Sequence, residues 1–64
     1  MESDRAQLSA MASTLDELTN RITEMAGRHT NSPREDVAQA LYDVERSLRS
    51  ANRNVAKAMR LMRG

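Results

Sequence analysis

The 64-residue chain lacks cysteine, tryptophan and phenylalanine, and its only aromatic residue is Tyr42. Without cysteine, neither a disulfide-stapled fold nor a cysteine-ligated zinc site can form. No apolar run approaches the ~18 residues that cross a bilayer, and the N-terminus does not have the pattern of a signal peptide, so we expect a cytoplasmic protein without a membrane span. A chain this short cannot wall off a substrate pocket of several hundred Å³. We therefore predict a binding protein without a cofactor, not an enzyme.

Proline and glycine are also scarce, with one and two residues, which leaves long stretches free to form helices. Large apolar residues recur at spacings of three and four, the heptad pattern of a helix that packs along one side. The first row of such residues comprises Leu8, Met11, Leu15, Leu18, Ile22 and Met25. The second row comprises Val37, Leu41, Val44, Leu48, Ala51, Val55, Ala58 and Met62. The two rows predict an all-α protein with two helices.

The segment between the two rows contains the turn signals. Gly27 suits the left-handed conformation that often follows the end of a helix. Ser32 and Glu35 have the spacing of a capping box, with Pro33 at the first helical position. These signals predict a first helix over about residues 4–26, a loop over 27–32 and a second helix over about 33–63.

The rows also predict a register if they face each other in an antiparallel hairpin. Facing residues then have a constant sum of sequence numbers, and pairs such as Leu15/Val44 and Leu18/Leu41 share a sum of 59. The centre of this register falls inside the predicted loop. We therefore expect one domain over residues 1–64, a coiled-coil-like antiparallel hairpin of two helices.

A single pair of helices has only one seam and leaves its core residues partly wet, so we expect the hairpin to self-associate. The simplest assembly is a homodimer that forms a four-helix bundle. Small residues beside the rows allow a second hairpin to approach, and the apolar C-terminal end could close the oligomer or bind a protein partner. The candidate oligomer or partner contacts are Ala12, Ala38, Met59, Leu61 and Met62.

The net charge of +1 conceals a division of charge along the chain. Residues 1–45 carry nine acids and four arginines, whereas residues 46–64 carry six bases and no acid. On a helical wheel, five of these bases share one outer face of the second helix, and the only tyrosine lies one turn earlier. The candidate anion or nucleic-acid contacts are Tyr42, Arg46, Arg49, Arg53, Lys57 and Arg60.

Two interpretations of this basic face stay open. Arginine forks bind phosphates and an exposed tyrosine can stack on a base, which suits a nucleic-acid-binding accessory protein. Alternatively, the face is only a solvated surface, because the helix dipole favours bases near a helix C-terminus and acids of the first helix lie beside them. His29 is the only histidine, and without a second histidine or a cysteine we expect no metal site.

The helical hairpin occurs with many functions, so the shape alone does not specify one. The leading hypothesis is a non-enzymatic helical interaction module, an oligomerising scaffold or adaptor that binds a protein partner. Nucleic-acid binding by the basic face is the alternative.

Overall fold

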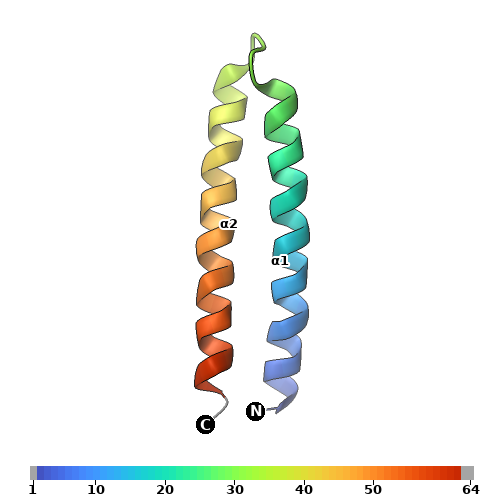
Figure 1. Ribbon diagram of the computed structural model, residues 1–64, viewed down its shortest axis with the longest axis vertical. Helices are drawn as coiled ribbons and strands as arrows, with labels where there is room; N and C mark the ends of the chain where they lie inside the picture. The colour runs from blue at the N-terminus through green and yellow to red at the C-terminus, as the bar shows by residue number, and fades with distance from the viewer. Residues whose placement is uncertain (1, 63–64) are drawn as a thin grey trace.

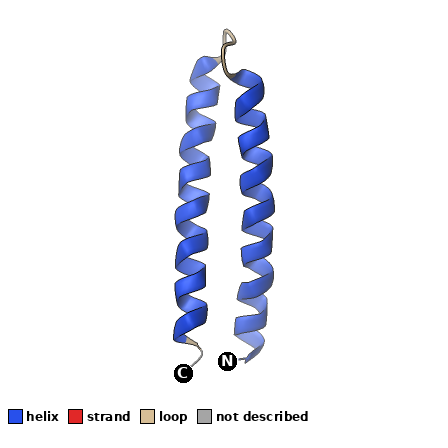
Figure 2. Ribbon diagram, in the orientation of Figure 1, coloured by secondary structure: helices blue, strands red, loops and turns tan. Residues whose placement is uncertain are grey.

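The computed structural model describes residues 2–62 as two antiparallel helices joined by a short loop (Figure 1). α1 spans Glu2–His29 and α2 spans Glu35–Leu61. Outside these helices, the described part of the chain contains only turn and loop segments (Figure 2). The predicted all-α hairpin is therefore confirmed. The predicted end of the second helix at residue 63 lies outside the described residues.

The turn between the helices lies later in the chain than predicted. α1 continues through Gly27, which does not have a positive φ, so the prediction that this glycine ends the helix is wrong. The left-handed residue is Asn31, with φ of 61°, and asparagine tolerates this conformation better than most residues. The Thr30 hydroxyl donates to the Ala26 carbonyl at 3.1 Å, which satisfies one of the last carbonyls of α1.

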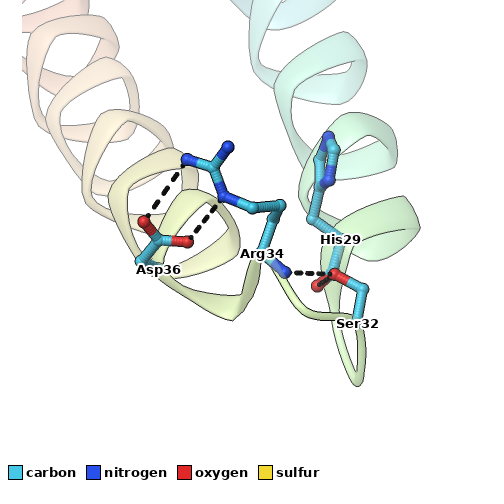
Figure 3. A network of polar contacts seen from close by, with 4 residues as sticks. All are labelled: His29, Ser32, Arg34 and Asp36. Atoms are coloured by element: carbon cyan, nitrogen blue, oxygen red, sulfur yellow. Dashed lines mark hydrogen bonds and ion pairs between the residues drawn. The ribbon is translucent and has the colours of Figure 1, made fainter.

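The predicted capping box stabilises the loop instead of capping α2. The N-cap residue is Arg34, whose side chain makes no capping hydrogen bond. The Ser32 hydroxyl accepts from the Arg34 backbone N–H at 3.1 Å and donates to the His29 carbonyl at 2.6 Å (Figure 3). The Glu35 carboxylate accepts from the Asn31 backbone N–H at 3.0 Å. The Ser32 hydroxyl and the Glu35 carboxylate therefore form hydrogen bonds within the loop, although the sequence motif predicts that they cap the N-terminus of α2.

Small and polar residues make the interface between the two helices. Ala26 and Ala38 are fully buried, and the side chain of Thr19 is nearly so. The Thr23 hydroxyl donates to the Glu45 carboxylate at 2.5 Å across the interface. Alanine allows two helix backbones to approach closely, and the most deeply buried residues of the hairpin are accordingly small, whereas large apolar residues such as Leu15 and Leu48 are only half-buried.

The observed register differs from the predicted one. The bonded pairs Thr23/Glu45 and Asp16/Asn52 both have sequence numbers that sum to 68, not 59. The difference of nine residues displaces α2 along α1 by about 13 Å relative to the prediction. The later turn accounts for about half of this difference, because the centre of a loop at residues 30–34 lies further along the chain than that of a loop at residues 27–32.

The two apolar rows lie side by side on one face of the hairpin, so the prediction that they face each other is wrong. Val55 of the second row shares a groove with Met11 and Leu15 of the first row. Met62 shares another groove with Leu8 and Met11. Since heptad spacing keeps the other members of each row on the same side of their helix, the two rows form a single apolar face.

The hairpin is long and thin, with Cα extents of 50 × 14 × 9 Å. Its radius of gyration is 14.8 Å, whereas a compact chain of this length has about 11 Å. Two helices side by side leave most apolar side chains in contact with water on one side. Neither described helix combines the length and the apolar character needed to cross a membrane.

Candidate interaction faces

The apolar face consists of the two rows and contains most of the large apolar side chains of the chain. Several of them are strongly exposed: Met11 is 51% exposed, Val44 41%, and Leu18 and Met25 39% each. A groove between the helices on this face is lined by Ala10, Met11, Thr14, Leu15 and Val55, and its walls are almost wholly apolar. The face therefore offers a continuous apolar surface to another molecule.

The opposite face of the hairpin is polar. A shallow hollow there is lined by Asp16, Thr19, Asn20, Arg49, Asn52 and Arg53. The Asn52 amide donates to the Asp16 carboxylate at 3.4 Å and links the helices at this level. Both signs of charge meet in this hollow, so it is not a simple anion site.

Glu45 lies at the centre of the polar contacts between the helices. Its carboxylate accepts from the Thr23 hydroxyl of α1 and from the Arg49 guanidinium at 3.2 Å, and its side chain is only 17% exposed. The hydrogen bond from Thr23 lowers the pKa of the Glu45 carboxyl below its usual value, and the Arg49 guanidinium lowers it further. The ionised form of Glu45 is therefore the form that the hairpin stabilises.

A second carboxylate is held in the ionised form at the start of α2. Arg34 pairs with Asp36 through two bonds, Nε–Oδ1 at 3.2 Å and Nη2–Oδ2 at 3.4 Å (Figure 3). This pairing, together with the Val37 backbone N–H, lowers the pKa of the Asp36 carboxyl. Both partners are well exposed to water, so the pair orders the loop end locally and adds little to overall stability.

The basic residues of α2 lie on exposed parts of the helix, as the heptad pattern predicts, but several have partners within α2. Arg46 pairs with Asp43, Arg49 pairs with Glu45, and the Arg53 guanidinium donates to the Ser50 hydroxyl at 3.1 Å. Lys57 and Arg60 are exposed toward the open end of the hairpin. Local acids thus neutralise the first part of the basic face, and the uncompensated charge lies nearer the C-terminus.

Tyr42 lies on the same side of α2 as Arg49 and Arg53, as the helical periodicity predicts, but it is less exposed than these bases. It is half-buried, and its hydroxyl oxygen lies 3.4 Å from Thr30 Oγ1 beyond the end of α1. The displaced register brings this part of α2 beside the loop end of α1. The hairpin therefore covers part of the Tyr42 side chain, and a contact of its ring with a base stays a prediction.

The predicted oligomer contacts fall into different environments. Ala38 is fully buried between α1 and α2, which removes it from the residues that can contact a partner, and Ala12 is half-buried. Met59 borders a hollow with Arg5, Ala6 and Ser9. Met62 belongs to the apolar face, and Leu61 is 74% exposed at the open end.

The residues that join the helices were not predicted from the sequence, although a signal for them is present. They occupy a second set of heptad-spaced positions, one residue after members of the apolar rows. In α1 and α2 this set comprises Ala12, Thr19, Ala26, Ala38, Glu45 and Asn52. The mixture of alanine with polar residues hides the pattern when only large apolar side chains are considered.

Residues 2–62 hold no cluster of three histidine, cysteine, aspartate or glutamate side chains that could bind a metal ion. Comparison with known proteins finds no matching family model, no similar curated protein and no similar solved structure.

Proposed function

We propose that this chain is a non-enzymatic helical interaction module, a self-associating scaffold or adaptor that binds proteins through its apolar face. The observation that carries the proposal is the exposure of Met11, Leu18, Met25 and Val44 on one side of the hairpin. Monomeric soluble proteins rarely leave so continuous an apolar strip in water. The lack of cysteine suits a reducing compartment, and we propose the cytoplasm as the place of action.

The heptad spacing of both rows indicates the kind of partner. Side chains at spacings of three and four pack into the gaps between side chains of a facing helix. The partner surface is accordingly helical, and a second hairpin would complete a four-helix bundle. In that bundle the apolar rows fill the centre, while the small and polar residues between α1 and α2 lie at the contact of adjacent helices.

Thermal unfolding at several protein concentrations tests this proposal. If association through the apolar face stabilises the fold, the Tm rises with protein concentration. Leu18→Glu places a charge on the apolar face, and we expect it to remove this dependence and to lower the Tm. The matched control is Asn20→Glu, which adds the same charge to the polar face of the same helix and should leave the concentration dependence intact.

A wild-type Tm that is independent of concentration, in a chain that is helical by circular dichroism, contradicts self-association. Equal effects of Leu18→Glu and Asn20→Glu contradict the role of the apolar face. Neither result contradicts the hairpin fold itself.

Nucleic-acid binding is the second candidate function, because Arg53, Lys57 and Arg60 are exposed in a segment of the chain without acids. The test is the affinity for duplex DNA and RNA across a salt series. Each phosphate contact contributes about −0.9 to the slope of log K against log salt on B-DNA. Replacing these three bases by glutamine should reduce the slope, whereas replacing Arg21, Arg28 and Arg34 should not. Absence of binding at low salt eliminates this candidate.

A further inference from the structure

The apolar face of a single hairpin is exposed to water, and in the proposed self-association a second copy covers it. On that basis we infer that two copies pack apolar face to apolar face with reversed direction, so that the loop end of one hairpin lies over the open end of the other. In this arrangement α1 packs against α1 of the second copy and α2 against α2. A two-fold axis perpendicular to the long axis relates the two copies.

The side chains of the α2 row are uneven in size, and this favours reversal. Toward the loop the row contains leucine and valine, whereas toward the open end it contains Ala51 and Ala58. Two copies with the same direction would place all four alanines toward one end of the bundle and leave that end underfilled. Reversal sets each alanine level with a leucine, which gives layers of similar volume. The level pairs of α2 are Leu41/Ala58, Val44/Val55 and Leu48/Ala51.

A single two-fold axis can relate α1 to α1 of the second copy and, at the same time, α2 to α2. The α2 row maps onto itself about a centre between Leu48 and Ala51, and the α1 row about a centre between Leu15 and Leu18. The sequence positions of these two centres add up to 66, whereas the sequence numbers of two residues at the same height in the hairpin add up to 68. The difference of two residues corresponds to about 3 Å along the axis. The two centres therefore lie at nearly the same height.

The charge along the hairpin also favours reversal. Residues 17–45, which form the loop half, carry six acids and three arginines, whereas the remaining residues carry seven bases and three acids. The separation is sharpest in α2, where residues 35–45 hold four acids and no base and residues 46–61 hold five bases and no acid. Reversal places the acidic half of one α2 beside the basic half of the other. The same-direction dimer places like charges beside each other without this gain.

Small residues next to the α2 row permit this close approach. Ala40, Ser47 and Asn54 border the row on the side away from α1, and none carries a charge. The polar face, with Arg49 and Arg53, points away from the second copy. Each copy therefore keeps its polar face open in the dimer.

Distances between spin labels test the direction of packing. Because the chain has no cysteine, Pro33→Cys gives a single label at the tip of the loop of each copy. In a hairpin 50 Å long, reversed packing separates the two tips by about 45–50 Å, whereas same-direction packing brings them within about 25 Å. Ser13→Cys is the matched control, because its position near the middle of α1 gives a distance that is set by the thickness of the bundle and depends little on the direction of packing.

A distance of about 45–50 Å at Pro33→Cys together with a clearly shorter one at Ser13→Cys is the expected result. A short distance at both positions overturns the reversed packing but leaves self-association standing. No intermolecular distance at either position, in protein that is helical, overturns both the reversed packing and the proposed self-association.

Discussion

Glu45 shows how a charged residue can sit between two helices without a large cost. Its side chain is largely covered, and its carboxylate accepts hydrogen bonds from Thr23 on α1 and from Arg49 on α2. A charge that leaves water needs such partners, because an unpaired carboxylate would protonate instead. This contact ties α2 to α1 near the middle of the hairpin.

The lowered pKa of Glu45 predicts a specific loss of stability in acid. Since the folded pKa lies below the unfolded one, the contribution is fully present above the ordinary glutamate value of 4.5 and disappears as the pH falls through the folded pKa. Glu45→Gln should be less stable than wild type at pH 7, and the difference should shrink below pH 4.5. Urea unfolding at a series of pH values measures it. Glu24→Gln, at an exposed position of α1, is the control.

Asn31 sets the direction of the turn through its positive φ. A β-branched residue in this conformation is strained, so Asn31→Val should lower the free energy of unfolding by about 1–2 kcal/mol. Asn31→Gly should cost far less because glycine adopts positive φ freely. Urea unfolding of the two variants compares them, and equal losses would show that the Asn31 side chain matters more than its backbone conformation.

At the scale of the helices, Gly27 is the residue whose role differs most from its sequence signal. It lies inside α1, and a Cβ added there would meet no atom within 4 Å. Gly27→Ala should therefore raise the free energy of unfolding by about 0.5–1 kcal/mol, because alanine loses less conformational entropy in a helix. Ala56→Gly, the reverse change at an exposed position of α2, should lower it by a similar amount. A destabilising Gly27→Ala would indicate that the chain needs glycine to leave the helix at this point.

The existence of both helices could be predicted from the sequence, because a long and unbroken heptad row is typical of a helix that packs along one side. The helix boundaries were less predictable. Gly27 and the Ser32–Glu35 motif each fit a helix end locally, whereas the burial of Ala26 and Ala38 between the helices favours a later turn. The register was not predictable from the rows at all. Residues that lie side by side on one face carry no information about which positions face each other.

The same limit applies to the candidate contacts. The exposure of Arg53, Lys57 and Arg60 follows from their distance around the helix from the apolar row, and it could be predicted. The burial of Ala38 and the partial cover of Tyr42 depend on where α1 lies against α2, which only the three-dimensional arrangement reveals. Helical periodicity indicates which residues share a face, but not which face the second helix covers.

At the scale of the whole molecule, both the elongated shape and the exposed apolar face indicate that a single hairpin buries little apolar surface. A hairpin 50 Å long and one helix thick buries few side chains completely, and its large apolar residues line one exposed side. Small domains of this size commonly obtain their missing burial by oligomerisation. We therefore expect the stability of the hairpin to be coupled to the occupation of its apolar face.

Sedimentation equilibrium of the wild-type chain at tens of micromolar tests this coupling most directly. We expect a mass of twice the 7.2 kDa chain, together with a strongly helical circular dichroism spectrum. Dilution should reduce the mass and the helical signal in parallel, because the apolar face loses its cover as the copies separate. A single helical species of 7.2 kDa across the whole concentration range would contradict the coupling.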